Sequence, residues 1–139
     1  RYFNVYGPRQ AADSAYAAVI PGFISLIKKG KPPQIFGDGC QSRDFTFVKD
    51  VVRANILAAQ SPQTGAYNIG SGMSISLREL CSQMLKMMDR TDITPVYASP
   101  RPGDVLHSLA EISRAKIAFG YNPLYSLEQG LKATIEDYE

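Results

Sequence analysis

Apolar residues recur at helical spacing in five stretches of this sequence. Two of the stretches open on a capping box, Ser76 with Glu79 and Ser126 with Gln129, in which side-chain oxygens accept backbone N–H groups of the first turn. Pro21 interrupts the first stretch, so it is expected in the first turn of that helix or at a bend. The predicted helices are residues 14–29, 50–60, 77–88, 112–119 and a last helix from residue 127 onward.

Short runs of aromatic and β-branched residues lie between these helices and predict strands. They are residues 1–6, 34–36, 43–48, 66–69 and 95–98. The stretch Phe36–Asp50 is expected to begin as a hairpin with a tight turn at Asp38-Gly39. Phe45 and Phe47 would then occupy alternate positions of its second strand. Because helices separate the strands, the pattern indicates an α/β fold with parallel pairing.

The strands predicted at residues 1–6 and 66–69 have no neighbouring strand in the sequence. Their partners are therefore expected upstream of Arg1. The chain also begins without a methionine and inside a strand-like run. We expect it to be the carboxy-terminal part of a longer protein.

The composition is that of an ordinary globular domain, with 45% hydrophobic and 20% charged residues. A net charge of +2 without any block of like charge gives no reason to expect nucleic acid or a membrane surface as a partner. No apolar run reaches the roughly 18 residues of a membrane-spanning helix. His107, Cys40 and Cys81 lack the spacing of metal ligands. Two reduced thiols are typical of a cytoplasmic protein.

Arg43 is the first candidate for chemistry, because a turn and a strand are predicted to hold it in place. A guanidinium fixed in this way presents a planar pair of donors to a phosphate or a carboxylate. The residues alone leave plainer roles open. Arg43 could instead be a surface charge, or it could pair with Asp44 or Asp50. Arg101 could likewise pair with Asp104 across a Pro-Gly loop.

Five phrases of the sequence together carry a family resemblance: Arg1–Gln10, Ala18–Pro21, Gly37–Val51, Tyr67–Gly70 and Arg101–Val105. In this order and spacing they resemble the carboxy-terminal half of the extended short-chain dehydrogenase/reductase family. Within it, the chain looks most like the NAD-dependent nucleotide-sugar epimerases and dehydratases, and above all like UDP-hexose 4-epimerases. The resemblance implies that residues 1–139 form a single substrate-binding region, in which residues 1–10 and 66–72 contribute Rossmann-type strands. The rest of that sheet and the NAD-binding part would lie outside this chain.

The resemblance also implies a set of residues around the substrate diphosphate. Asn4 resembles an asparagine that hydrogen-bonds the diphosphate region. Ala18 and Val19 resemble the start of a helix whose backbone amides face the diphosphate, a placement that helix N-termini favour. Arg43 and Arg101 resemble two arginines that clamp it.

The nucleoside would have its own contacts by the same resemblance. Gln34, Ile35 and Phe36 resemble the segment that lies along the uracil, with Phe36 supplying an apolar face. Asp104 resembles the acid that holds the ribose hydroxyls.

The family reaction that the resemblance implies is NAD-dependent epimerisation at C4 of a UDP-hexose, by oxidation, rotation of the 4-keto intermediate and reduction from the other face. The partner would be a UDP-sugar and the intact enzyme a homodimer, while the chain alone would tend to self-associate through open strand edges. Two family motifs are absent from the chain. No glycine phrase has the third glycine of a dinucleotide-binding loop, and none of the eight tyrosines has a lysine four positions later.

These absences lead us to expect that the 139 residues neither hold NAD nor turn over substrate by themselves. Two alternatives stay open. The intact protein could be a nucleotide-sugar 4,6-dehydratase or decarboxylase of the same superfamily, or the chain could be a stand-alone nucleotide-sugar-binding module.

Overall fold

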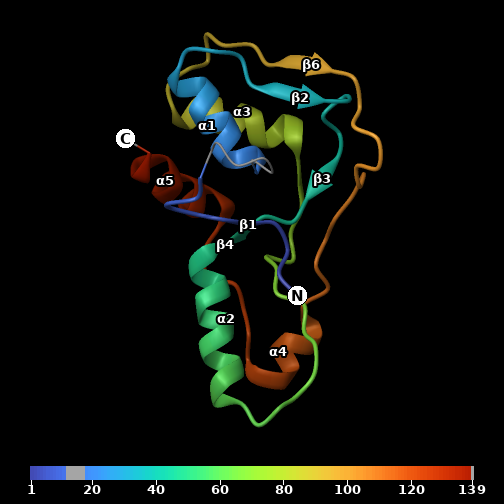
Figure 1. The fold of residues 1–139 in the computed structure, drawn as a ribbon. Coiled ribbons are helices and arrows are strands. Elements are labelled where there is room, and N and C mark those ends of the chain that lie inside the picture. Colours follow the sequence, from blue (N-terminus) through green and yellow to red (C-terminus); the bar gives the residue numbers. More distant parts are fainter. Residues whose placement is uncertain (12–17, 139) are drawn as a thin grey trace.

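The structure is a computed structural model that describes residues 1–11 and 18–138. Helices α1, α3 and α5 gather at one end of the molecule, α2 and α4 lie at the other, and strands β1 and β4 run between the two groups (Figure 1). The α/β class predicted from the sequence is confirmed. The elements are β1 (Val5–Tyr6), α1 (Val19–Lys28), β2 (Gln34–Phe36), β3 (Ser42–Arg43), β4 (Thr46–Phe47), α2 (Val48–Gln60), β5 (Ile75–Ser76), α3 (Leu77–Met87), β6 (Val96–Ala98), α4 (Ser113–Phe119) and α5 (Leu127–Asp137).

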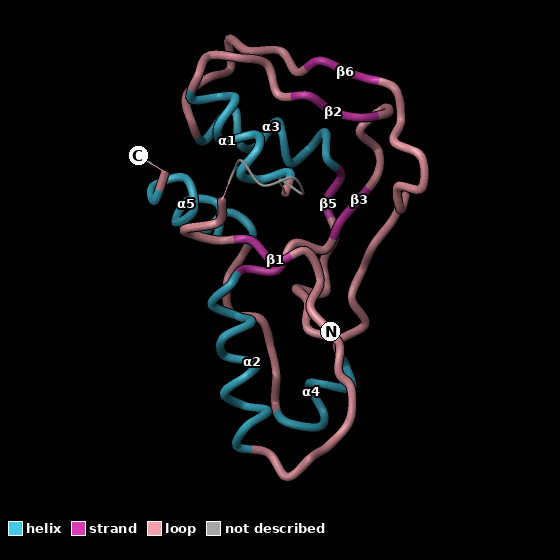
Figure 2. The backbone as a smooth tube through the Cα atoms, viewed as in Figure 1, coloured by secondary structure: helices cyan, strands magenta, loops and turns pink. Residues whose placement is uncertain are grey.

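The described strands form three two-stranded sheets. β1 pairs with β4 and β2 with β6 in parallel, whereas β3 and β5 are antiparallel (Figure 2). Parallel pairing was predicted and is confirmed for two of the sheets. Each parallel pair joins segments far apart in the chain.

The hairpin predicted at Phe36–Asp50 is wrong, because β2 and β3 do not pair. Gly37 is left-handed, with φ of 74°, and its N–H donates to Ala98 O at 2.8 Å. The turn therefore starts while β2 is still bonded to β6. The chain leaves the turn toward β5, where Arg43 lies opposite Ile75.

The two strands expected to lack partners in the chain bond to each other. Tyr2 and Ile69 form an isolated parallel bridge. Phe3 N–H donates to Ile69 O at 3.0 Å, and Ile69 N–H donates to Arg1 O at 2.8 Å. Each strand thus has one neighbour within the chain. The expectation that further partner strands lie upstream of Arg1 stays a prediction.

Helices α2, α3, α4 and α5 begin near their predicted positions, whereas α1 begins at Val19 and not at residue 14 as predicted. Both capping boxes are formed, at the starts of α3 and α5. Helix α1 begins at Val19 with Pro21 in its first turn, where a missing N–H costs nothing. Ala18 precedes it with extended backbone, and residues 14–17 of the predicted helix lie outside the described residues. None of the helices within residues 1–11 and 18–138 is long and apolar enough to cross a membrane.

Two hydrophobic clusters hold the two ends of the molecule. The larger one packs α1, α3 and α5 against β2 and β4, and it contains the predicted apolar stripe of α3, with Leu80, Cys81, Met84 and Leu85 all buried. Burial raises the pKa of the Cys81 thiol to about 11. The smaller cluster packs α2 against α4 through Val51, Ala54 and Ala115.

Candidate functional site

A cavity of about 390 Å³ opens between β1, the start of α1 and the segment that contains β2 and β3. Most of the residues singled out in the sequence line it, although they come from distant segments. Ile35 is the exception, because its side chain is 1% exposed and packs in the larger hydrophobic cluster. The predicted residues that line the cavity are Asn4, Ala18, Val19, Gln34, Phe36, Arg43, Arg101 and Asp104.

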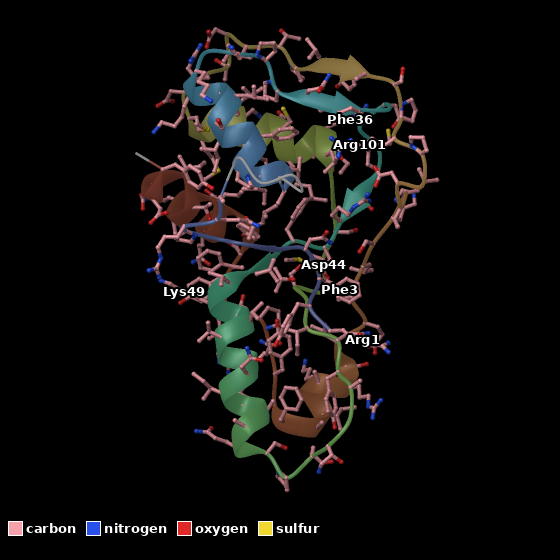
Figure 3. All side chains as sticks on the ribbon, in the orientation of Figure 1. Arg1, Phe3, Phe36, Asp44, Lys49 and Arg101 are labelled. Carbon is pink, nitrogen blue, oxygen red and sulfur yellow. The ribbon has the colours of Figure 1, made fainter. Side chains whose placement is uncertain are left out.

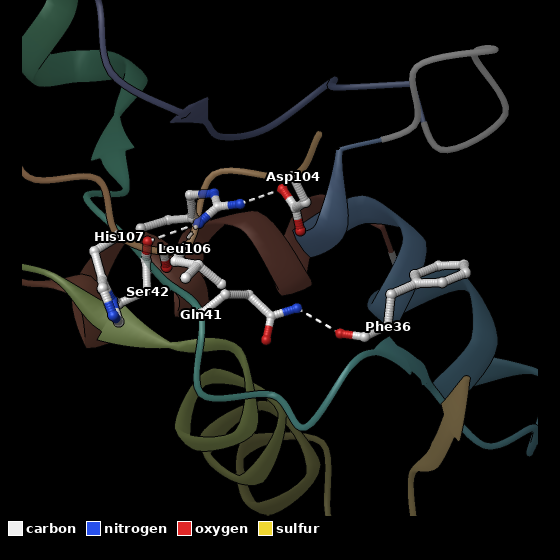
Figure 4. A network of polar contacts seen from close by, with 7 residues as sticks. Phe36, Gln41, Ser42, Asp104, Leu106 and His107 are labelled. Atoms are coloured by element: carbon white, nitrogen blue, oxygen red, sulfur yellow. Dashed lines mark hydrogen bonds and ion pairs between the residues drawn. The ribbon is translucent and has the colours of Figure 1, made fainter. Parts of the chain in front are cut away.

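Arg43 and Asp104 form an ion pair on the cavity wall, with 2.5 Å between Nη2 and Oδ1 (Figure 4). Nη1 of Arg43 donates to Ser42 O at 2.9 Å. The structure therefore has neither of the alternative ion pairs considered for Arg43 and Arg101. Arg43 pairs with neither Asp44 nor Asp50, and the Asp104 side chain pairs with Arg43 rather than with Arg101.

Arg101 stacks on Phe36, with its guanidinium carbon 3.8 Å from the centre of the ring. Both residues lie at the β2 end of the cavity (Figure 3). Within residues 1–11 and 18–138, no hydrogen bond or ion pair engages the Arg101 side chain. A guanidinium on an aromatic face keeps its outer N–H groups available, because the contact uses its plane rather than its edge.

Asn4 lines the cavity with an unusual backbone, at φ of 25°. Its Nδ2 donates to Asp44 O at 3.1 Å, and its own carbonyl accepts Thr46 N–H at 3.2 Å. These two bonds join β1 to the segment just after Arg43. They hold the amide of Asn4 at the cavity with one N–H of Nδ2 left over.

Asp44 directly follows Arg43, and sequence reasoning gave it no site role. It is fully buried, and its carboxylate accepts four hydrogen bonds of 2.7 to 3.1 Å, from Ser71 N–H, Ser71 Oγ–H, Gly72 N–H and Ala110 N–H. With its carbonyl bonded to Asn4, Asp44 links four segments at the middle of the molecule (Figure 3). The sequence signal that could have identified Asp44 is its position between Arg43 and the aromatic residues Phe45 and Phe47.

Gln41 is a second residue that sequence reasoning missed. It is 7% exposed, lines the cavity, and donates from Nε2 to Phe36 O at 2.5 Å (Figure 4). This bond closes the turn between β2 and β3 in place of the predicted hairpin. It fixes the backbone of Phe36 relative to that of the following Arg43.

The first turn of α1 faces the same cavity through Ala18, Val19 and Gly22. Among the described residues no side chain caps this helix start, and its first turn has no acidic residue. Its backbone N–H groups and the positive end of the helix dipole therefore favour an anion from outside. Two arginines, an uncapped helix start and an aromatic face suit an anionic ligand that carries a ring.

Comparison with known proteins decides the family. A family model described as "NAD dependent epimerase/dehydratase family" matches residues 1–70. This chain belongs to that family.

Three members of the NAD-dependent epimerase/dehydratase family illustrate the similarity. UDP-glucose 4-epimerase of Mycolicibacterium smegmatis is 36% identical over 96% of this chain and 42% of its own length. UDP-N-acetyl-alpha-D-glucosaminuronate decarboxylase of Bacillus cytotoxicus is 36% identical over 98% of this chain and 44% of its own. A solved UDP-N-acetylglucosamine 4-epimerase of Methanobrevibacter ruminantium, in complex with UDP-N-acetylmuramic acid, is 44% identical with a TM-score of 0.94, over 99% of this chain and 44% of that one. The chain thus spans less than half the length of these family members.

Neither glycine phrase among the described residues of this family member is free to bind the phosphates of a dinucleotide. In a phosphate-binding glycine loop, backbone N–H groups stay free to face the phosphates. Here the N–H groups of Ser71 and Gly72 are taken by Asp44. Gly37 already donates to β6. Within residues 1–11 and 18–138 there is also no group of three or more His, Cys, Asp or Glu side chains that could hold a metal ion.

Proposed function

We propose that this chain is the part of an NAD-dependent nucleotide-sugar 4-epimerase that binds the UDP portion of the substrate. The observation that carries the proposal is the meeting of two guanidiniums, a phenyl ring and a carboxylate around one cavity, from Arg43, Arg101, Phe36 and Asp104. NAD and the residues that react at C4 of the sugar would belong to sequence other than these 139 residues. The chain alone is therefore expected to bind UDP without turning over a UDP-sugar.

The diphosphate would lie between the arginines and the first turn of α1. Arg101 has its N–H groups available, and Val19 begins a helix with no acceptor of its own at the N-cap. Each charge-assisted hydrogen bond of this kind contributes roughly 1.5–3 kcal/mol. The remaining N–H of Asn4 would reach a phosphate oxygen at the β1 side of the cavity.

The nucleoside would lie along β2. Phe36 provides the apolar face for the uracil, and Gln34 and the backbone of Ile35 provide polar contacts beside it. Asp104 would accept hydrogen bonds from the ribose hydroxyls. Since the side chain of Ile35 is buried, its proposed role is limited to its backbone.

This division of labour suits an epimerase. The hexose must turn between oxidation and reduction at C4, while the rest of the substrate stays fixed. Binding energy placed on the nucleotide holds the substrate through both steps without restraining the sugar. NAD would supply the hydride acceptor and donor.

A second candidate is a nucleotide-sugar decarboxylase. It is favoured by the 36% identity to the Bacillus cytotoxicus enzyme, which equals the identity to the Mycolicibacterium epimerase. The same UDP anchor would serve both reactions. Incubating the intact protein with NAD and a UDP-hexuronic acid separates them, because a decarboxylase releases carbon dioxide and an epimerase conserves the mass of the sugar.

Calorimetric titration of the purified protein with UDP tests the proposal. Arg101→Ala should weaken UDP binding at least about tenfold, the equivalent of about 1.4 kcal/mol. Arg114→Ala is the matched control, because Arg114 also stacks on an aromatic ring, that of Tyr67, but lies outside the cavity. Equal UDP affinity in the two variants, or no UDP binding by the wild-type protein, would contradict the proposal.

A further inference from the structure

The guanidinium of Arg43 is already engaged inside the cavity. Its Nη2 donates to Asp104 Oδ1, and its Nη1 donates to Ser42 O at 2.9 Å and Leu106 O at 3.4 Å. The side chain of Arg43 is 14% exposed and that of Asp104 is 36% exposed. A carboxylate of the chain therefore occupies the position at which an external anion would meet this arginine.

Arg101 differs from Arg43 in this respect. Its plane covers Phe36, and within the described residues its side chain has no ion-pair partner. The cavity thus presents one open guanidinium and one that is neutralised by Asp104. These bonds use at most three of the five N–H groups of Arg43. An anion that binds both arginines therefore either displaces the carboxylate or binds next to it, and in both cases it lies near a like charge.

We propose that Asp104 is a specificity-determining residue, which makes the cavity reject bare inorganic anions and accept a nucleoside diphosphate. The inference rests on the proposed function. Phosphate and pyrophosphate bring only acceptor oxygens to a carboxylate released from Arg43. A nucleoside diphosphate brings ribose hydroxyls, whose O–H groups donate to that carboxylate and offset the broken ion pair.

The location of Asp104 permits this exchange. It lies in the segment between β6 and α4, whose residues 99–107 are all exposed. The neighbouring Gly103 is left-handed, with φ of 77°. A Cβ added at Gly103 would have no described atom within 4 Å beyond its chain neighbours, so the space around this segment is open. Asp104 can therefore move from the guanidinium to a ligand without disturbing either hydrophobic cluster.

The neutral variant Asp104→Asn separates the two ligand classes. It removes both the competing ion pair and the like charge, so pyrophosphate should bind about fivefold more tightly. UDP should not bind more tightly, because its ribose loses a charged acceptor. The preference for UDP over pyrophosphate should therefore fall at least about fivefold.

Asp92→Asn is the matched control. It removes the same charge from the other ion pair within the described residues, between Arg90 and Asp92, which lies outside the cavity. Any change in pyrophosphate affinity that arises from net charge alone would appear in both variants. Titration calorimetry of the purified protein with sodium pyrophosphate and with UDP, at one fixed ionic strength, gives all the affinities needed.

The results of these titrations test the inference on Asp104 separately from the proposed function. Tighter pyrophosphate binding in Asp104→Asn only, without tighter UDP binding, supports the role of Asp104. If the wild-type protein binds UDP and the variant leaves pyrophosphate affinity within twofold, the inference is wrong and the proposed function stands. Equal tightening for both ligands also overturns the inference, because Asp104 would then repel anions without discriminating. If the wild-type protein does not bind UDP, both the inference on Asp104 and the proposed function are wrong.

Discussion

Gln41 donates a hydrogen bond of 2.5 Å to the carbonyl of Phe36 and thereby sets the position of the aromatic face in the cavity. The bond spans the glycine turn between β2 and β3, so the ring of Phe36 and the guanidinium of Arg43 are held at the two ends of one short, closed loop. This rigid loop is the part of the site on which the proposed recognition of a nucleotide depends.

Replacing Phe36 should affect ligands that carry a base. Phe36→Leu should weaken UDP binding about fivefold or more, since stacking of a base on an aromatic ring contributes roughly 1–3 kcal/mol. Pyrophosphate affinity should change less than twofold. Titration of both ligands checks this, with Phe119→Leu as the control, because Phe119 packs on Tyr67 outside the cavity. A parallel loss of both ligands would contradict a specific contact with the base, because Phe36 would then act through the Arg101 guanidinium that stacks on it.

Gly70 should not tolerate a methyl group. A Cβ there would lie 2.2 Å from Ala110 Cβ and 2.8 Å from Asp44 Oδ2. Gly70→Ala should therefore lower the free energy of unfolding by about 1–3 kcal/mol through overpacking. Gly22→Ala is the opposite case, because outside its chain neighbours and its own helix backbone no described atom lies within 4 Å of its Cβ position in α1. It should stabilise by roughly 0.5–1 kcal/mol. Urea unfolding of the two variants measures the difference, and the same sign for both would contradict the packing argument.

Asp44→Asn should destabilise the protein strongly. The amide places an NH2 group where the carboxylate now accepts backbone N–H groups, so buried donors face each other. We expect a loss of at least about 3 kcal/mol in the free energy of unfolding, given that a hydrogen bond to a charged group contributes roughly 1.5–3 kcal/mol. The exposed Asp38 accepts Cys40 N–H at 2.8 Å, and an asparagine oxygen can replace that acceptor. Asp38→Asn should therefore cost less than about 1 kcal/mol, and a similarly small cost for Asp44→Asn would refute the role of Asp44 as a structural hub.

Stability should fall in alkaline solution because of Cys81. Burial raises its pKa from 9.0 to about 11 in the folded protein, so the unfolded chain loses the thiol proton first. The stabilising contribution of the neutral thiol is complete below pH 9 and is lost as the pH rises toward 11. Between pH 8 and pH 10 the free energy of unfolding should drop about 1 kcal/mol more in the wild-type protein than in Cys81→Ala. Identical pH profiles for the two proteins would contradict this.

Features of local origin were predictable from the sequence. The capping boxes at Ser76 and Ser126 depend on residues three positions apart, and the apolar stripe of α3 depends on one helical period. Both signals lie within a few residues, so tertiary contacts do not have to be known. The α/β class followed from the same local elements.

Pairing between distant segments was not predictable in the same way. β2 bonds to β6 some sixty residues later, and the Asp38-Gly39 turn looked like a hairpin only because the competing bond from Gly37 to Ala98 is invisible in the sequence. The bridge between Tyr2 and Ile69 was missed for the same reason.

The residues that line the cavity were predicted from the family resemblance and not from hydrophobic periodicity. That resemblance named Arg43 and Asp104 separately, for different parts of a ligand. Their ion pair depends on the path of an exposed segment between β6 and α4, which no local pattern encodes. The buried carboxylate of Asp44 escaped notice because an acid next to Arg43 suggested a surface pair. The ligand contacts of these residues stay predictions.

A crystal structure of the purified protein with UDP tests the central claim most directly. The account predicts the diphosphate within hydrogen-bonding distance of both Arg43 and Arg101, the uracil against the ring of Phe36, and the Asp104 carboxylate turned from Arg43 to the ribose. UDP bound elsewhere, or bound in the cavity with its diphosphate away from both arginines, would contradict it.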